Sequence, residues 1–131
     1  MKHAMLEHVN ITVSEPLRTA AMLEQLFGWK IRWQGPAKNE GYTVHVGSED
    51  TYLAVYSLGG KPSANKLLSY QTKGGLNHVG IVVDDLDATE ELVKQAGYKP
   101  HNHGDYEPGR RFYFHDADGI EFEVISYVDQ S

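Results

Sequence analysis

Apolar and polar residues alternate in two short stretches of the chain that are near copies of one another. Residues 6–13 read Leu-Glu-His-Val-Asn-Ile-Thr-Val, and residues 76–83 read Leu-Asn-His-Val-Gly-Ile-Val-Val. Successive side chains of a strand point to opposite faces, so each stretch predicts a strand with one apolar face to bury and one mixed face. His8 and His78 occupy equivalent positions on the mixed faces. The chain therefore contains an internal repeat, and a repeat constrains the whole fold.

The elements that follow each copy are predicted in the same order. Ser14 is suited to cap a helix that Gly28 ends, and the acidic pair Asp84 and Asp85 is suited to begin a second helix that Gly97 ends. Strands are predicted at 30–34, 42–46, 51–57, 98–101, 110–115 and 121–127, with turns at 35–39, 47–50 and 116–119 and a polar loop at 102–109.

This order predicts an α+β protein made of two tandem β-α-β-β-β modules, at residues 4–57 and 76–128, within one domain spanning 1–131. Each helix is expected to cover the outer face of a cupped mixed sheet, which leaves the opposite face concave and more polar. Residues 58–75 connect the modules, and their leucines and tyrosine indicate a segment that is partly packed. A cleft between the modules is the natural place for a small-molecule site.

The composition of the chain excludes several classes of function. The chain has 131 residues, a formal net charge of −6 and no cysteine. The negative charge argues against a nucleic-acid surface, which needs clustered Lys and Arg. No apolar run approaches the roughly 20 residues of a membrane span, and the first residues lack the apolar core of a signal peptide, so we expect a cytoplasmic protein that binds no membrane. Without cysteine, any metal site must use histidine, carboxylate or water.

The last predicted strand adds a third residue to the mixed faces. Its parity puts Glu123 and Glu121 on the face opposite the apolar side chains, and the internal alignment matches Ala54 of the first half to Glu123. We therefore expect His8, Ala54, His78 and Glu123 to point into the cleft, and three of these four are metal-ligating residue types. Glu121 is the alternative carboxylate ligand. Its position in the strand relative to the preceding turn places it nearer the rim of the cleft.

Other polar side chains surround this set. Neighbouring strand residues face opposite ways, so only one of Arg110 and Arg111 can point inward, where it could clamp a carboxylate or phosphate. His45 or His115 could act as a general base, although either also fits a position at the rim. Strand parity directs the following residues toward the cleft: Asn10, Thr12, Thr43, His45, Tyr52, Tyr56, Arg111, Tyr113 and His115.

The histidine strands 6–11 and 76–81 resemble those of the vicinal oxygen chelate superfamily, which includes glyoxalase I, extradiol dioxygenases, fosfomycin thiol transferases and bleomycin-binding proteins. Residues 116–124 are similar to the family signature Asp-Pro-Asp-Gly-x-x-x-Glu, with Ala117 in place of proline. The resemblance covers almost the whole chain and implies a glyoxalase/dioxygenase-like fold. It also implies that His8, His78 and Glu123 are metal ligands.

Ala54 departs from the family pattern, because glyoxalase I-like members carry a carboxylate there as a fourth ligand. A glutathione-dependent glyoxalase I activity is therefore disfavoured. The remaining two-His-one-carboxylate set suits Fe or Mn, with Ni or Zn as alternatives, and leaves positions open for a chelating substrate. The resemblance is compatible with dioxygenase, isomerase or lyase, and thiol-transferase chemistry. It also suggests Tyr113 as a hydrogen-bond partner for a bound oxygen, whereas His101 and His103 are expected to be solvated loop residues.

A different class of function remains open. Bleomycin-resistance relatives bind an antibiotic in an aromatic cleft without a metal, and this chain has aromatic residues for such a cleft. In either case the expected partner is a small molecule. The resemblance also implies a homodimer, either side by side or with modules exchanged. In the exchanged form, His8 of one chain would face His78 and Glu123 of the other. The aromatic residues considered for the cleft are Trp33, Tyr52, Tyr56 and Tyr113.

Overall fold

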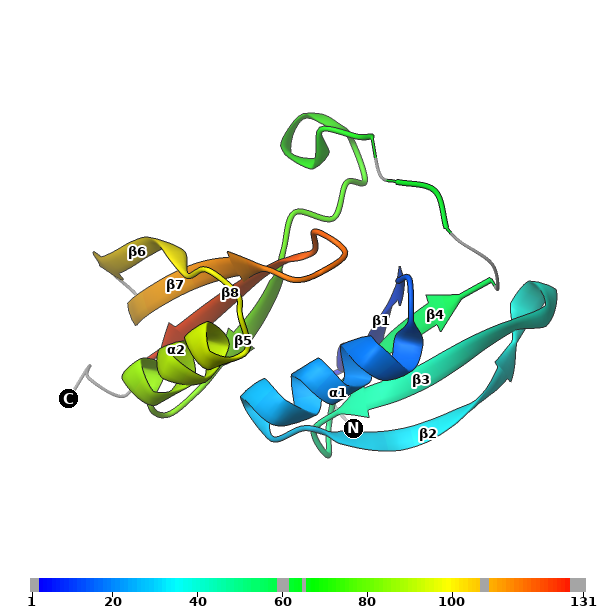
Figure 1. Ribbon diagram of the computed structural model, residues 1–131, viewed down its shortest axis with the longest axis horizontal. Helices are drawn as coiled ribbons and strands as arrows, with labels where there is room; N and C mark the ends of the chain where they lie inside the picture. The colour runs from blue at the N-terminus through cyan, green and yellow to red at the C-terminus, as the bar shows by residue number, and fades with distance from the viewer. Residues whose placement is uncertain (1–2, 59–61, 65, 107–108, 128–131) are drawn as a thin grey trace. The chain divides into compact units, whose positions relative to one another are not determined.

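The computed structural model describes residues 3–58, 62–64, 66–106 and 109–127. The chain divides into two compact units, residues 1–64 and 65–131, and one of the predicted repeats falls in each. Each unit has a mixed four-stranded sheet and one α-helix (Figure 1), which confirms the predicted α+β class and the β-α-β-β-β order. No helix among the described residues is long and apolar enough to cross a membrane.

The two sheets have the same topology. In both, the first strand of the unit pairs in parallel with the last, and the other neighbours are antiparallel, giving the orders β1-β4-β3-β2 and β5-β8-β7-β6. The elements of unit 1 are β1 (His8–Thr12), α1 (Pro16–Phe27), β2 (Lys30–Ala37), the 3-10 turn η1 (Lys38–Glu40), β3 (Gly41–Gly47) and β4 (Tyr52–Ser57). The elements of unit 2 are η2 (Ser69–Gln71), β5 (Val79–Val82), α2 (Leu86–Gln95), β6 (His101–Tyr106), β7 (Gly109–His115) and β8 (Glu121–Ser126).

Strand register confirms the internal alignment made from the sequence. Asn10, two residues after the first repeat histidine, lies opposite Ala54 on β4. Gly80, two residues after the second, lies opposite Glu123 on β8. Ala54 and Glu123 are therefore structurally equivalent, and the carboxylate is replaced by a methyl group in unit 1.

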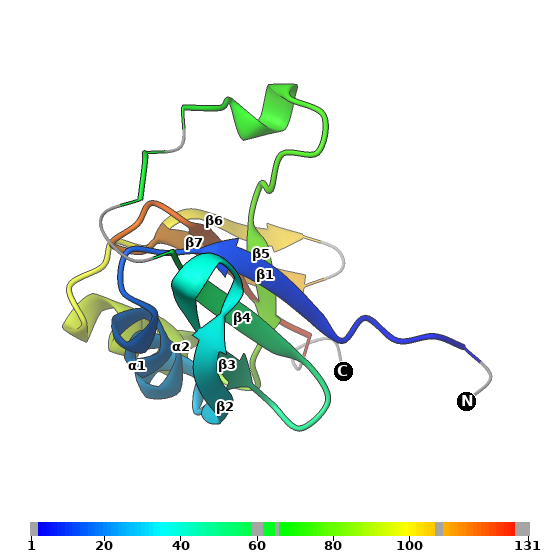
Figure 2. The same ribbon diagram turned by 90° about the vertical axis from the view of Figure 1, so that its right-hand side faces the viewer.

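One face of each sheet is buried under its own helix (Figures 1 and 2). In unit 2, Phe112, Phe114 and Phe122 are fully buried together with Val93 of α2. Each such aromatic side chain contributes about 2–3 kcal/mol through removal from water. Unit 1 uses smaller residues in the same way, with Val44 and Val46 fully buried beside α1. The strict alternation leaves the opposite face of each sheet for polar groups.

The two helices begin differently, although both end as predicted at a glycine or beside one. Glu15, not Ser14, is the N-cap of α1, and its side chain makes no capping hydrogen bond among the described residues. In α2 the N-cap is Asp85, whose carboxylate accepts a hydrogen bond from the amide of Ala88 at 3.0 Å. Gly28 ends α1 in the left-handed conformation at φ 69°.

Three segments differ from the sequence prediction. β2 extends to Ala37, beyond the expected end at residue 34, and β6 spans residues 101–106, not 98–101. β6 has few apolar residues, so its strand conformation depends on backbone pairing with β7, which no side-chain pattern reveals. The connector was expected to pack in part. Leu67 and Leu68 are 61% and 67% exposed, whereas Tyr70 contacts side chains of unit 2, so the expectation holds for the tyrosine and not for the leucines. Residues 59–61 and 65 of the connector, 107–108 of the predicted loop and 128 of module 2 lie outside the described part of the chain.

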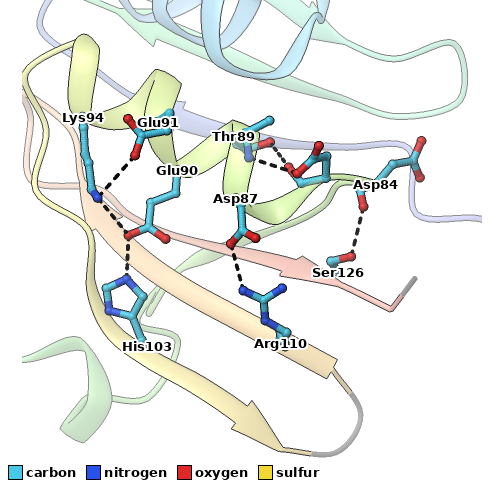
Figure 3. A network of polar contacts seen from close by, with 11 residues as sticks. Asp84, Asp87, Thr89, Glu90, Glu91, Lys94, His103, Arg110 and Ser126 are labelled. Carbon is cyan, nitrogen blue, oxygen red and sulfur yellow. Dashed lines mark hydrogen bonds and ion pairs between the residues drawn. The ribbon is translucent and has the colours of Figure 1, made fainter. Parts of the chain in front are cut away.

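The helix side of unit 2 carries its own surface ion pairs (Figure 3). Arg110 pairs with Asp87 of α2 at 2.9 Å, and His103 contacts Glu90 at 2.7 Å. Arg110 therefore faces α2, and the neighbouring Arg111 points to the opposite face of the sheet, as strand alternation predicts. His103 lies in a strand, so the expectation that it is a loop residue was wrong.

The contrast between the two caps predicts a difference in stability. We expect Asp85→Ala to lower the free energy of unfolding by about 1 kcal/mol, because it removes the acceptor for an otherwise unpaired amide. Glu15→Ala is the matched control. It removes only an exposed ion pair with Arg18, so its effect should stay within about 0.5 kcal/mol. Urea unfolding followed by circular dichroism measures both, and equal losses would contradict a capping role for Asp85.

Candidate functional site

Unit 2 brings His78 and Glu123 together on the sheet face opposite α2. His78 lies just before β5 and Glu123 lies on the adjacent β8, and His78 Nε2 is 3.0 Å from Glu123 Oε1. The second oxygen of Glu123 accepts a hydrogen bond from Arg111 Nη1 at 2.8 Å. The side chains of Arg111 and Glu123 are only 10% and 12% exposed, so this is a nearly buried ion pair. One carboxylate is thus held by a cation on one side and faces an imidazole on the other.

Arg111 was expected to clamp a substrate carboxylate or phosphate, but the structure gives it protein partners. Its guanidinium also donates to the backbone carbonyls of Tyr106 and Gly109, and it lies 4.4 Å from the centre of the Tyr106 ring. Burial disfavours the charged form, yet the hydrogen bond to Glu123 and the charges of its neighbours outweigh it and raise the pKa of Arg111. Arg111 therefore serves to position Glu123.

The other nitrogen of His78 meets Tyr70 of the connector. The Tyr70 hydroxyl donates to Glu121 Oε1 at 2.7 Å, so its lone pair faces His78 Nδ1 at 3.1 Å. The hydrogen bond to Glu121, with burial and that carboxylate's charge, raises the pKa of Tyr70 to about 12. Tyr70 was not identified from the sequence. The sequence shows only that the connector contains a tyrosine, an aromatic residue with a polar end. The contact between Tyr70 and His78 could not be derived without the fold.

Tyr113 lies beside this pair on β7, directly opposite Glu123 in the antiparallel register. Its ring meets His78 edge-on at 5.6 Å. Burial, followed by the charge of Glu123 and a hydrogen bond to it, raises the pKa of Tyr113. The phenol therefore stays protonated at neutral pH, and its single hydrogen is directed to Glu123.

Unit 1 presents an aromatic face around His8. The His8 ring stacks on Tyr52 at 4.9 Å, and Tyr52 stacks on His45 at 4.6 Å. Trp33 lies 5.2 Å from His45, so four rings are in a continuous series across β1, β4, β3 and β2. His8 Nδ1 is 2.9 Å from the carboxylate of Glu7, its neighbour in the chain.

His45 is held in its neutral form on this face. Burial comes first among the causes that lower the pKa of His45, and electrostatic interaction with His8 and Arg32 acts in the same direction. A cavity of about 390 Å³ adjoins His45 and continues past Thr43 to the polar side chains of β1, Asn10 and Thr12. A larger cavity of about 510 Å³ opens at the start of α1, away from the strand faces that carry the histidines, so we do not assign chemistry to it.

The two repeat histidines use the same ring nitrogen to contact their own surroundings. Each directs Nδ1 at an oxygen of the protein, Glu7 for His8 and Tyr70 for His78. Such a contact fixes the imidazole tautomer and leaves Nε2 to act as a ligand, the arrangement common to metal-binding histidines. The 3.0 Å between His78 Nε2 and Glu123 Oε1 matches two adjacent ligands of one ion at bond lengths of about 2.1 Å. The donor set therefore fits a divalent metal.

Other site predictions were less accurate. Glu121, expected nearer the rim, is 15% exposed and almost as buried as Glu123. His101, expected in a solvated loop, lies in β6 and stacks on His115 at 5.0 Å. The error for His101 follows from the misplaced bounds of β6. Glu121 lies on β8, away from β6, and its carboxylate accepts a hydrogen bond from Tyr70 of the connector at 2.7 Å, a contact that the strand pattern does not reveal.

Arg110 and Arg111 offer a matched pair for a stability test in EDTA. Arg111→Met keeps the apolar stem but leaves the carboxylate of Glu123 unpaired, and we expect it to cost about 3 kcal/mol of unfolding free energy. Arg110→Met breaks an exposed pair and should cost less than about 1 kcal/mol. Adding Glu123→Gln to Arg111→Met should recover part of the loss. Equal effects of the two single substitutions would refute the buried-pair account.

Comparison with known proteins adds relatives of the same fold. A structure of a glyoxylase/bleomycin resistance protein/dioxygenase domain from Frankia sp. EAN1pec matches with a TM-score of 0.79 and 21% identity, covering 95% of this chain and 98% of that one. FosX, a fosfomycin resistance protein from Listeria monocytogenes solved with Mn(II) and sulfate, matches with a TM-score of 0.72 and 18% identity over 95% and 93% of the two chains. TnmS3, an antibiotic binding protein from Streptomyces sp. CB03234, matches with a TM-score of 0.73 and 17% identity over 96% and 98%.

Sequence comparison agrees with the structural one. The chain is 30% identical over 133 aligned positions to "Probable lactoylglutathione lyase, chloroplastic" of Arabidopsis thaliana, and it covers 36% of that protein's length while 95% of this chain is aligned. A family model for the Glyoxalase/Bleomycin resistance protein/Dioxygenase superfamily matches residues 5–124. The match includes both repeat histidines with their strands, and it includes Glu123 on β8. The chain therefore belongs to the Glyoxalase/Bleomycin resistance protein/Dioxygenase superfamily.

Proposed function

We propose that this chain is a divalent-metal protein that acts on a small molecule with two neighbouring oxygen atoms. The ligands would be His8, His78 and Glu123, supplied either by one chain or by the two chains of a dimer. The observation that carries the proposal is the 3.0 Å approach of His78 Nε2 to Glu123 Oε1, with every remaining polar atom of that pair held by the protein. Two imidazoles and one carboxylate leave positions for substrate oxygens.

When bound, such a metal supplies Lewis-acid polarisation of the substrate oxygens. The residues of this chain contribute the rest. Arg111 holds Glu123 in place, and Tyr70 and Glu121 fix the ring of His78. Tyr113 keeps its hydroxyl hydrogen, since its pKa is raised, and would turn it from Glu123 to a substrate oxygen. His45, whose pKa is lowered, carries a neutral imidazole that can accept a proton.

The metal and the reaction are inferred from the ligand set. Fe or Mn fits a two-His-one-carboxylate site with open positions, and Ni or Zn is the alternative. The Mn(II) in the Listeria FosX structure supports the first choice. The likeness to a lactoylglutathione lyase supports lyase or isomerase chemistry, but Ala54 replaces the carboxylate that a fourth ligand would need. Dioxygenase, lyase or isomerase, and thiol-transferase chemistry all remain within the proposal.

A second candidate is antibiotic binding without catalysis. It is favoured by the ring series His8, Tyr52, His45 and Trp33 next to a cavity of about 390 Å³, which could stack a planar ligand. The likeness to the antibiotic binding protein TnmS3 supports it further.

A homodimer, side by side or with modules exchanged, and a cytoplasmic location stay predictions.

Manganese content after dialysis tests the metal site. We expect the parent to retain about one Mn²⁺ per chain, and His8→Ala, His78→Ala and Glu123→Ala each to lose most of it, because each substitution removes one of three protein ligands. The matched control is His103→Ala. This histidine is exposed and pairs with Glu90 on the helix side, so its loss should leave the metal content unchanged.

The outcome also separates the two candidate functions. A parent that takes up no Mn²⁺, Fe²⁺, Ni²⁺ or Zn²⁺ through these three residues contradicts the metalloprotein proposal. Antibiotic binding then predicts that a planar aromatic ligand quenches the fluorescence of Trp33 and that Tyr52→Ala abolishes this quenching. Loss of metal from the Glu123 and His78 variants but not from the His8 variant would restrict the site to unit 2.

A further inference from the structure

A second group of metal-ligating side chains lies on the sheet of unit 2, toward its β6 edge. It consists of His101 on β6, His115 on β7 and Glu121 on β8. His101 Nε2 is 3.1 Å from His115 Nδ1, and His115 Nε2 is 3.6 Å from Glu121 Oε2. One ligand atom from each of the three residues lies within 4.8 Å of the others. All three belong to unit 2, so the cluster is complete within it.

The distances fit a single ion. Zinc–nitrogen bonds are about 2.0–2.1 Å long, which places two ligands of a tetrahedral site about 3.3 Å apart. The separation of 3.1 Å between the ring nitrogens is close to that value. A hydrogen shared by two neutral imidazoles would span the same distance, but it would not account for the carboxylate as a third donor. An imidazole gives only one of its nitrogens to an ion, so the contacts that His115 makes through its two nitrogens do not both count toward one site. The three ligand atoms, one from each residue, lie within 4.8 Å of one another, and binding of one ion would draw them closer through rotation of the His115 side chain, which is 49% exposed.

We propose that His101, His115 and Glu121 form a separate site for a borderline divalent cation such as Zn²⁺. Two imidazole nitrogens and one carboxylate oxygen favour Zn²⁺, Ni²⁺ or Cu²⁺ over Mn²⁺, because affinity at nitrogen ligands rises along that series. The remaining ligand positions are filled by water, since His115 is half-exposed. This site does not use His8, His78 or Glu123, so it goes beyond the function proposed above.

Glu121 gives the site a connection to His78. Its Oε2 faces His115, whereas its Oε1 accepts the hydrogen bond from Tyr70, whose oxygen contacts His78 Nδ1. A cation bound through Oε2 would restrict the rotation of this carboxylate and so stabilise the contacts that orient His78. Occupancy of the cluster would therefore influence the proposed ligand, although the two ions would share no atom.

Zinc stoichiometry tests the site. Full-length parent, His101→Gln and His115→Gln are dialysed against Zn²⁺ and analysed for metal, with His103→Gln as the matched control. His103 lies two residues from His101 on the same strand but pairs with Glu90 on the helix side. We expect the first two variants to hold about one Zn²⁺ fewer per chain than the parent, and the control to equal it. Equal zinc content in parent, His101→Gln and His115→Gln overturns the proposal.

Nitrogen-15 resonances of the histidine rings provide a second readout in the unaltered parent. Added Zn²⁺ should shift the ligand nitrogens of His101 and His115 and leave those of His103 in place. The metal content of the Glu123→Gln variant distinguishes failure of the second site from failure of the function proposed above. If it retains the zinc that depends on His101, while no ion of any kind depends on Glu123, then only the function proposed above fails. If zinc depends on Glu123 and His101→Gln has no effect, then only the second site fails.

Discussion

The carboxylate of Glu123 imposes the main constraint on unit 2. It is nearly buried on a sheet whose other face is an aromatic core, and a buried charge without partners would cost several kcal/mol. Arg111 satisfies one oxygen and leaves the other beside His78. The ring of Tyr106 covers the guanidinium, so the pair is shielded as well as bonded. The position of the candidate ligand is thus set by the same ion pair that makes its burial tolerable.

The two units show how one scaffold supports different chemistry. Their strands pair in the same order and register, yet the polar face of unit 1 is mainly aromatic and that of unit 2 is mainly ionic. A carboxylate in unit 1 would lack the arginine that unit 2 provides, since Thr43 stands there and instead contacts the Val55 carbonyl. The acid and the cation that pairs with it are therefore both present in unit 2 and both missing from the equivalent positions of unit 1. The equivalent pairs, by register, are Ala54 and Glu123, Thr43 and Arg111, His45 and Tyr113, and Trp33 and His101.

The sequence predicted those parts of the fold that apolar side chains determine. Period-two alternation located β1, β5, β7 and β8 and put His78 and Glu123 on one face, because burial of one face leaves no freedom in the register. It misplaced β6, which was expected at residues 98–101 and spans 101–106, because this strand is held by backbone hydrogen bonds and carries polar residues. The contact between Tyr70 and His78 was equally out of reach, because the course of the connector depends on packing and not on periodicity.

The replacement of a carboxylate by Ala54 has an electrostatic consequence for the proposed metal site. A divalent ion held by two neutral imidazoles and the carboxylate of Glu123 keeps one net positive charge, whereas a second carboxylate would cancel it. The guanidinium of Arg111, 2.8 Å from the other oxygen of Glu123, adds a further positive charge beside the ion and does not cancel this excess. The uncompensated charge favours a substrate that presents an anionic oxygen, such as an enolate, a catecholate or a carboxylate, over a neutral diol. A site of this kind would select its substrate by charge before it selects by shape.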